Sequence, residues 1–517
     1  MKKVFLFAAI FAQAFAASAQ ETYEMATIET PDLNGSARYV GMGGAMEALG
    51  ADLSTINSNP AGIGLFRKGQ ASISFGFVSQ GGEEETLGVS PTRMSFDQAG
   101  VVFSTNTSDR KVSFLNFAFN YSKSCNFSQI LNAANQSVDG SAQNKQTFGK
   151  IRSEIVTSPD DNNYNVVDYL YYNADHCGLL NPTDSCFDAQ SYNMNRASTG
   201  YIGNYDFNIS GNIGNKVFLG LTFGIKDVHY DASSAYTEML VDVNNELSPA
   251  VLKDERTITG TGIDFRFGTI IRPFDESPFR VGLWAATPTF YNLRSSCYTR
   301  LVAGGESLAN EETYRYKFQT PWKFGASIGH TFGQMFAFGA TWEYADYSTT
   351  SPRIDNGGYY DAWGDYYSSS TKDVEMKYNV KQSLKGSHTL KLGAEIKPVP
   401  EFAIRMGYNY VSPIYKETGY KDPAVWSLGN YYTSQTDFTN WKATHRITAG
   451  LGYSSRNFFA DLAYQYSTQT GDFYPFTSGE FAWTNNEGKK VTMANVPTIT
   501  EVKNKRHQLL LTLGIKF

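Results

Sequence analysis

Histidines and cysteines are the residues of this chain that could most readily act as bases, nucleophiles or metal ligands. A hydrolase needs a nucleophile or an activated water beside an oriented base, and no spacing here assigns such a partner to any imidazole. The six histidines are His176, His229, His330, His388, His445 and His507. We therefore predict no enzyme, no catalytic residue and no cofactor, and a hydrolase assembled from distant strands stays open as an alternative.

The four cysteines suit disulfide bonds better than a metal site. They are Cys125, Cys177, Cys186 and Cys297. Their spacing does not match a zinc site, and His176 is the only imidazole nearby. Cys177 with Cys186 would close a short loop and Cys125 with Cys297 would then join two loops, while the other two connectivities stay open. All four fall in predicted external loops, where an oxidising assembly route permits disulfides, and we predict no metal.

A belt of charged residues lies on one face of segments that alternate like β-strands. Its members are Asp264, Arg266, Glu343, Lys391, Glu395, Arg405 and Asp461. Glu395 and Arg405 come close across the tight Pro398-Val399-Pro400 turn. The belt either is solvated in a lumen or grips an inserted segment. Apolar residues on the same face predict an oily lining that could contact a substrate, namely Phe114, Phe218, Trp284 and Leu510.

The elements that position these residues are strands of an all-β protein, a transmembrane antiparallel β-barrel. Period-two alternation predicts about fourteen strands between residues 69 and 517, most clearly over residues 70–79, 112–122, 201–210, 216–226 and 262–271. Such a barrel hides its apolar band in every second residue, which fits a mean hydropathy of −0.35 with 15% aromatic residues. Short turns alternate with long polar segments, among them residues 231–256 and 289–320, and we assign the long segments to the outside. A secreted β-sandwich or propeller is the alternative.

The amino terminus has the pattern of a secretory leader. Lys2 and Lys3 precede an apolar run over residues 4–15, and Ala17-Ser18-Ala19 fits a cleavage site. We predict a signal peptide over residues 1–19. The formal net charge of −6 offers nothing that attracts nucleic acid.

Residues 35–66 differ from everything that follows, because small residues dominate and strand alternation is absent. Asn59-Pro60-Ala61-Gly62 predicts a fixed turn, since proline lacks a donor and restricts the residue before it, whereas glycine reaches positive φ. We also expect a short helix over roughly residues 45–49. Such a segment must pack inside something else, and the strands after residue 69 are its natural container.

This segment resembles the amino-terminal hatch of outer-membrane transporters for hydrophobic compounds, the FadL/TodX-type family typified by the long-chain fatty-acid transporter FadL. The matching stretches are Gly41-Met42-Gly43-Gly44-Ala45, Ala51-Asp52 and Asn59-Pro60-Ala61-Gly62. The resemblance continues through residues 280–291 and 461–464 to Phe517, the terminal residue of the last strand. A dinucleotide-binding loop is the alternative for Gly41-Met42-Gly43-Gly44, but no βαβ unit surrounds it.

The resemblance implies a hatch over residues 20–68 inside a barrel over residues 69–517. It also implies a set of gating residues in the hatch, which are Gly43, Gly44, Asn59, Pro60, Ala61 and Gly62. In the family, substrate is captured by outer loops, shifts the hatch and leaves sideways at a kinked third strand. Residues 111–122 hold neither glycine nor proline, so the kink cannot be read from this sequence.

Residues 165–172 of the longest predicted loop carry another candidate contact for substrate. If this stretch is helical, Leu170 and Tyr171 share one face with Val166 and Val167. An exposed apolar patch usually marks a binding site, and packing against a neighbouring loop is the alternative. We favour capture of substrate at Leu170 and Tyr171.

Together these features predict a monomeric channel of the bacterial outer membrane for passive, hatch-gated uptake of small hydrophobic molecules such as long-chain fatty acids. Its partners would be that hydrophobic substrate, outer-membrane lipids and the barrel assembly machinery, without nucleic acid. A general aqueous porin or a structural barrel is the main alternative, and the hatch and the inward aromatic residues argue against it. A plugged haem receptor of about 22 strands would need a larger plug and barrel.

Overall fold

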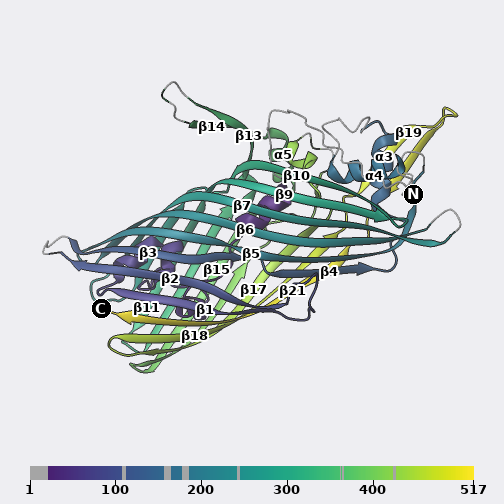
Figure 1. Ribbon diagram of the computed structural model, residues 1–517. Helices are drawn as coiled ribbons and strands as arrows, with labels where there is room; N and C mark the ends of the chain where they lie inside the picture. Colours follow the sequence, from purple (N-terminus) through teal and green to yellow (C-terminus); the bar gives the residue numbers. More distant parts are fainter. Residues whose placement is uncertain are drawn as a thin grey trace.

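A computed structural model describes residues 21–107, 112–155, 165–176, 185–241, 245–360, 363, 366–422, 425 and 427–517. These residues form a closed antiparallel β-barrel with 14 strand positions (Figure 1). β1 (Gln70–Gln80) closes the barrel, because it pairs with β2 (Thr92–Asn106) on one side and with β21 (Thr500–Lys516) on the other. The predicted fold class is therefore confirmed. The predicted signal peptide lies outside the described residues.

Some strand positions hold one unbroken strand and others hold two shorter strands in line. The other unbroken strands are β5 (Asp188–Ile213), β6 (Val217–Val241), β7 (Leu247–Ile271), β16 (Phe402–Val411), β17 (Phe438–Ser454) and β18 (Phe458–Tyr474). The divided ones are β3 (Val112–Asn126) with β4 (Gln129–Asn135), β8 (Arg280–Ala286) with β9 (Phe290–Ala303), β10 (Glu306–Gln319) with β11 (Lys323–Phe332), β12 (Phe336–Asp346) with β13 (Ser351–Tyr360), and β14 (Tyr366–Lys372) with β15 (Gly386–Val399). Pro288 and Pro321 lie at two of these breaks, because proline cannot donate to a strand ladder.

Helices lie inside the barrel or at the end that carries the long connections, which we call the outer end (Figure 1). Those inside are α1 (Thr22–Glu29), α2 (Ala37–Gly41) and the 3-10 helices η1 (Leu53–Asn57) and η2 (Pro60–Leu65). The outer end holds α3 (Gln143–Arg152), α4 (Val166–His176), α5 (Val374–Ser383), α6 (Leu428–Tyr431), η3 (Tyr347–Thr349) and a hairpin of β19 (Gly479–Thr484) and β20 (Lys490–Asn495). None of the described helices is long and apolar enough to cross a membrane.

The short helix expected over residues 45–49 is wrong. Those residues form turns, and the helix lies earlier, at α2. The side chain of Ser36 caps α2 by accepting a hydrogen bond from the amide of Tyr39, which satisfies one of the free donors of the first turn.

The outer surface of the barrel carries an apolar band over the part of each strand nearest the short turns. Exposed side chains in this band include Leu219 and Leu221 on β6 and Phe265 and Phe267 on β7. β6 is 25 residues long, although about ten residues suffice to cross a membrane. The remainder of β6 and β7 therefore projects beyond the band at the outer end.

Segments that we predicted as external loops are in part these strand extensions. Residues 231–256 belong largely to β6 and β7, and β9 and β10 occupy most of residues 289–320. Beyond the apolar band, Thr257 and Thr261 of β7 face outward, while Asp254 and Arg256 face inward and are buried. These buried charges therefore interrupt the alternation of apolar with polar residues that signals a half-buried strand.

α4 packs inside the outer end of the barrel. Leu170 and Tyr171 are each 1% exposed and lie in a core with Tyr192, Tyr236 and Leu301 of the surrounding strands. The exposed patch predicted at Leu170 and Tyr171 is therefore wrong, and the packing alternative holds. The reason is that the extended strands surround α4 and bury its apolar face.

Candidate functional site

The amino-terminal segment, residues 21–66, lies within the barrel (Figure 1). α2 contacts β16, β17 and β18, whereas η2 contacts β5, β6 and β7 on another part of the wall. Most side chains of the segment are buried. This placement is consistent with the predicted division into an inserted segment and a surrounding barrel.

Inward-facing glycines let the backbone of the segment approach the strands closely. A Cβ at Gly393 of β15 would lie 2.2 Å from the carbonyl oxygen of Met42, and one at Gly407 of β16 would lie 2.1 Å from the amide nitrogen of Gly43. Other strands provide similar glycines, which are Gly220, Gly268 and Gly339. We did not single out these residues from the sequence, although a glycine at inward positions of several strands was a usable signal.

Two turns of the segment contain the predicted gating residues Gly43, Gly44, Asn59, Pro60, Ala61 and Gly62. Gly43 and Gly44 follow α2 with φ of 62° and 79°, a region that favours glycine. Asn59 begins η2, where its Oδ1 accepts from the amide of Ala61 at 3.1 Å and its Nδ2 donates to the carbonyl of Thr269 at 3.1 Å. The second turn is thus tied to β7, and its part in gating stays a prediction.

The predicted belt of charges forms three ion-pair clusters, each in contact with the segment. In the first, Nε of Arg405 lies 2.6 Å from Oε2 of Glu395, and Nη1 of Arg405 lies 2.6 Å from Oδ1 of Asp461. Arg38 of α2 joins this cluster with Nε at 3.3 Å from Oε2 of Glu395. Glu395 and Arg405 are therefore paired, as we expected from the short turn between their strands.

The second cluster is built around Lys391 of β15. Its Nζ lies 2.9 Å from Oε1 of Glu47 in the segment and 2.6 Å from Oε1 of Glu343 on β12. Glu47 is 0% exposed and also accepts hydrogen bonds from the hydroxyls of Thr341 at 2.5 Å and Tyr39 at 3.3 Å. The segment therefore carries a fully buried carboxylate whose charge is compensated by the barrel.

The third cluster joins η1 to β5 and β7. Arg266 lies 2.8 Å from Asp206 and 3.0 Å from Asp264, measured from Nη1 and Nη2 to the carboxylate oxygens. Nη1 of Arg266 also donates to Oδ1 of Asn57 in the segment at 3.0 Å. All three clusters agree with a belt that holds an inserted segment by ion pairs and hydrogen bonds. That these contacts control gating stays a prediction.

The predicted apolar contacts for substrate fall in different surroundings. Phe218 and Leu510 are 1% and 0% exposed and pack beneath residues of the segment. The ring of Phe114 is covered by the guanidinium of Arg67, 4.5 Å from the ring centroid. Trp284 lines a cavity. The segment occupies the lumen next to the first three, so a role for them in binding would require that it moves.

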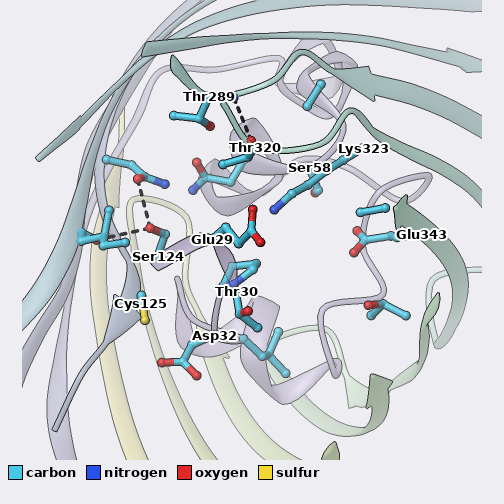
Figure 2. Close-up of a pocket in the computed structure, with 18 of the residues that line it drawn as sticks. Glu29, Thr30, Asp32, Ser58, Ser124, Cys125, Thr289, Thr320, Lys323 and Glu343 are labelled. Atoms are coloured by element: carbon cyan, nitrogen blue, oxygen red, sulfur yellow. Dashed lines mark hydrogen bonds between the residues drawn. The ribbon is translucent and has the colours of Figure 1, made fainter. Parts of the chain in front are cut away.

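Two cavities lie on either side of the first residues of the segment. The outer cavity, of about 250 Å³, is lined by aromatic residues that include Tyr23, Tyr230 and Trp441 and by charged residues such as Arg196 and Asp437. The inner cavity, of about 200 Å³, has many charged and hydroxyl side chains in its wall (Figure 2). Residues 28, 30 and 32 line both cavities. The end of α1 and the residues after it therefore separate the two spaces.

The inner cavity contains polar groups without hydrogen-bond partners among the described residues. Nε1 of Trp284 and Oε1 of Glu29 are buried and unpaired, while Oε2 of Glu29 accepts from the hydroxyl of Thr350 at 2.6 Å. Burial raises the pKa of Glu29 to about 8, so its carboxyl group is mostly protonated at pH 7. Figure 2 shows Glu29 in this cavity with Lys323 on its wall. The cavity can thus offer donors to a polar group of a ligand.

Sequence reasoning did not find Glu29 or Lys323. Glu29 precedes the motif-bearing part of the segment, and Lys323 follows the break at Pro321, where strand alternation restarts. We see no sequence signal that would have brought these two residues together.

The ladder between β2 and β3 ends before the outer end of either strand. It runs from the pair Asn106 and Phe114 to the pair Gln98 and Ser122. A bulge in β2 next to that end turns Asp97 inward beside Gln98. Beyond it, Asn34 of the segment donates to Oδ1 of Asp97 at 2.8 Å and to the carbonyl of Lys123 at 3.1 Å. A side chain of the segment thus bridges two strands where their backbone ladder has stopped.

The cysteines differ from the prediction. Cys125, Cys186 and Cys297 are free thiols, so the pairing of Cys125 with Cys297 is not formed. These two lie in strands β3 and β9 and are buried, rather than in external loops. Cys177 lies outside the described residues. The described residues contain no group of three or more His, Cys, Asp or Glu side chains placed to hold a metal ion.

The sequence matches no family model and no curated protein. Solved structures do match. A FadL homologue of Pseudomonas aeruginosa is 12% identical, with a TM-score of 0.50 over 94% of this chain and 99% of that one. The toluene transporter TodX of Pseudomonas putida is 12% identical with a TM-score of 0.48, and TbuX of Ralstonia pickettii is 11% identical with 0.47, each covering 94% of this chain and 99% of its own. The first match shows that this chain has the fold of the FadL homologue.

Proposed function

We propose that this protein is an outer-membrane channel for the passive uptake of small hydrophobic molecules, and that residues 21–66 are its hatch. The observation that carries the proposal is the position of residues 28–32, which separate an outer cavity from an inner cavity within the lumen. An aqueous porin would need a continuous water-filled lumen, whereas here the lumen holds a packed segment. A solved structure that shares this fold is a FadL homologue.

The two cavities support an amphiphile as substrate. Tyr23, Tyr230 and Trp441 can contact an apolar body in the outer cavity. In the inner cavity, Nε1–H of Trp284 lacks an acceptor among the described residues, and the ammonium group of Lys323 lies in the same wall. These donors suit a carboxylate or another acceptor at one end of the molecule. A long-chain fatty acid has both parts.

The route that we propose begins at the outer cavity and requires the segment to move. Substrate in the outer cavity would displace residues 28–32 and enter the inner cavity. Ser122 and Lys123, at the end of the ladder between β2 and β3, line that inner cavity. Asn34 bridges the strands at this place, so a shift of the segment would also remove the bridge and favour a sideways exit into the membrane.

A reversible cross-link between segment and barrel tests this proposal. A Cβ at Gly41 would lie 3.2 Å from Cα of Gly450, and one at Gly450 would lie 3.3 Å from Cα of Gly41. Gly41→Cys with Gly450→Cys should therefore form a disulfide after a small adjustment. We would measure uptake of radiolabelled oleate and of toluene by cells that lack their own transporters for these compounds. Each single cysteine variant is a matched control.

We expect the oxidised double variant to lose uptake, the reductant to restore it, and both single variants to transport under either condition. Heat-resistant migration of the barrel in detergent gels shows that the variants fold. Full uptake through the cross-linked barrel would contradict the hatch. Absence of uptake of both probes by the folded wild-type protein would contradict the proposed channel function itself.

A further inference from the structure

Three histidines have the same surroundings on the outer surface of the barrel. His388 lies on β15, His445 on β17 and His507 on β21, and each stands directly opposite a tyrosine of the neighbouring strand. Each ring also contacts, through Nδ1, the aromatic residue two positions before that tyrosine. The contacts are Trp342 Nε1 at 3.3 Å for His388, Tyr408 hydroxyl at 2.8 Å for His445 and Tyr464 hydroxyl at 2.7 Å for His507.

The three rings mark the outer edge of the apolar band. Two residues further along the three strands, Leu390, Ile447 and Leu509 are 46%, 62% and 44% exposed. All three strands run from the outer end toward the short turns. Each histidine is therefore placed where the lipid-facing surface begins, at the level of the headgroups on the outer side of a membrane.

The rings also form an evenly spaced row. Six neighbouring strands follow one another around the barrel in the order β12, β15, β16, β17, β18 and β21. The first, third and fifth carry the two aromatic residues that contact a histidine, and the second, fourth and sixth carry the histidine itself. Since neighbouring strands lie about 4.8 Å apart, the histidines repeat every roughly 10 Å.

The register between the strands places the row at one height. Tyr410 of β16 pairs with Leu390 of β15 and with His445 of β17. Tyr466 of β18 pairs with Ile447 of β17 and with His507 of β21. Each histidine is thus shifted by two residues from the one before. A constant shift of this kind is what tilted barrel strands require of residues at one height.

The contacts at Nδ1 leave the other ring nitrogen without a hydrogen bond among the described residues, and in His507 this nitrogen lies beside Gly81, whose Cβ, if present, would be 3.1 Å away. The indole N–H of Trp342 only donates, so Nδ1 of His388 accepts and the neutral ring carries its proton on Nε2. The hydroxyls of Tyr408 and Tyr464 can donate in the same way. Within the described chain no hydrogen bond reaches Nε2 of the three rings. His229 on β6 differs, because its Nε2 lies 2.9 Å from Oδ2 of Asp227, and it is not part of the row.

We propose that the row His388, His445 and His507 binds the phosphate groups of anionic lipid headgroups in the outer leaflet. A phosphate oxygen is a charged acceptor and forms a strong hydrogen bond with an N–H donor. The exposed Lys505, two positions before His507 on the same face, adds positive charge. The acyl chains of such a lipid would lie along the apolar band that begins at Leu390, Ile447 and Leu509. The inference rests on the proposed outer-membrane location but not on what the lumen transports.

The test removes the donors and keeps the rings. A variant with His388→Phe, His445→Phe and His507→Phe is compared with wild type and with His330→Phe. His330 is a matched control, because it lies at the end of β11 near the short turns, where its ring is tilted toward that of Phe279 and edge-on to that of Phe332, with centroids 6.3 and 4.4 Å away. Each protein, purified in dodecyl maltoside, is titrated with phosphatidylglycerol or with a galactolipid that has no phosphate. Native mass spectrometry counts the bound lipids.

We expect phosphatidylglycerol to bind roughly tenfold more weakly to the triple phenylalanine variant, as for loss of a hydrogen bond to a charged group at each site. Galactolipid binding should not change, and His330→Phe should match wild type. A triple glutamine variant, whose side-chain N–H groups can still donate, should recover part of the affinity. Unchanged phosphatidylglycerol binding in the phenylalanine variant, or an equal loss of galactolipid, would overturn the proposal. Oleate uptake by the same variants reports separately on the channel.

Discussion

Replacing Lys391 by methionine should loosen the amino-terminal segment and leave the barrel closed. Nζ of Lys391 lies 2.9 Å from Oε1 of Glu47, a residue that is 0% exposed. Methionine keeps an apolar stem of similar length but has no ammonium group. Glu47 would then keep only the hydroxyls of Thr341 and Tyr39 as donors. The ladders of β12, β15 and β16 are made of backbone hydrogen bonds and do not need this charge.

The size of the effect follows from the charge left behind. Removing one partner of a buried ion pair costs about 3–5 kcal/mol. At pH 7 a glutamate can be protonated instead at a cost of about 3.7 kcal/mol, which sets an upper limit on the penalty. Because each 1.4 kcal/mol is a factor of about ten, the ratio of seated to displaced segment should fall roughly 150- to 500-fold.

Entry of a small polar antibiotic into cells, or conductance across a planar bilayer, measures this change. We expect a higher leak for Lys391→Met, with unchanged heat resistance of the barrel in detergent. Lys150→Met is the matched control, since Nζ of Lys150 lies 2.5 Å from Oδ2 of Asp168 in an equally buried pair between α3 and α4. Residues 21–66 should stay seated in that control.

A double variant separates the charge from the shape. Glu47→Gln together with Lys391→Met removes the unpaired carboxylate of the segment, while Glu343 on β12 loses Lys391 in both variants, so the double variant should leak less than Lys391→Met alone. A leak no higher than that of Lys150→Met would refute the claim that this ion pair holds the segment. A double variant as leaky as the single one would show that Glu47 is not the residue through which Lys391 acts.

Two further predictions concern the packing of residues 21–66 against the barrel wall. Burial raises the pKa of Glu29 from 4.5 to about 8. The protonated carboxyl group therefore favours the packed position of α1 fully below pH 4.5. This contribution is lost as the pH rises through 8. The leak of polar solutes should therefore increase up to tenfold per pH unit between these values, and in Glu29→Gln it should not depend on pH. A leak through the wild-type protein that is the same at all these pH values would contradict this prediction. Gly407→Ala places a methyl group 2.1 Å from the amide nitrogen of Gly43 and should destabilise the packed position of the segment by about 1–3 kcal/mol, which raises the leak. Gly211→Ala is the control, because nothing lies within 4 Å of a Cβ there, and it should leave the leak unchanged.

The barrel could be predicted because membrane strands present lipid on one face and the lumen on the other. Leu219 and Leu221 alternate with Gly220 and Thr222, and lipid-facing residues cannot be polar without cost. The outer halves of β6 and β7 could not be predicted in the same way. Their outward side faces water, and on their inward side buried charges such as Arg256 and Asp254 lie between apolar residues such as Leu252, so the apolar signature of the inward face is interrupted.

The candidate site was partly predictable for a related reason. Once a strand has an outward face, the residues between are inward, and the charges at Lys391 and Arg405 follow directly. Their partners in the segment do not follow, because Glu47 and Arg38 lie in a stretch without periodicity and meet the wall through tertiary packing. Leu170 misled us because an apolar helical face looks the same from sequence whether solvent or strands surround it.

The contacts of the two inserted parts indicate which one can move. α4 is held by an apolar core that it shares with the surrounding strands, and separating such surfaces exposes both to water without compensation. Residues 33–49 of the segment instead keep their own apolar cluster of Leu33, Tyr39, Met42, Met46 and Leu49 largely to themselves, whereas the apolar residues of α1 belong to a core shared with the strands. Residues 33–49 meet the wall through ion pairs, small apolar contacts and glycines that permit close approach. When water enters, a separated carboxylate and ammonium regain hydration that offsets much of what they lose. We therefore expect displacement of residues 33–49 to cost less than displacement of α4 or α1, so that this part of the proposed hatch would move first.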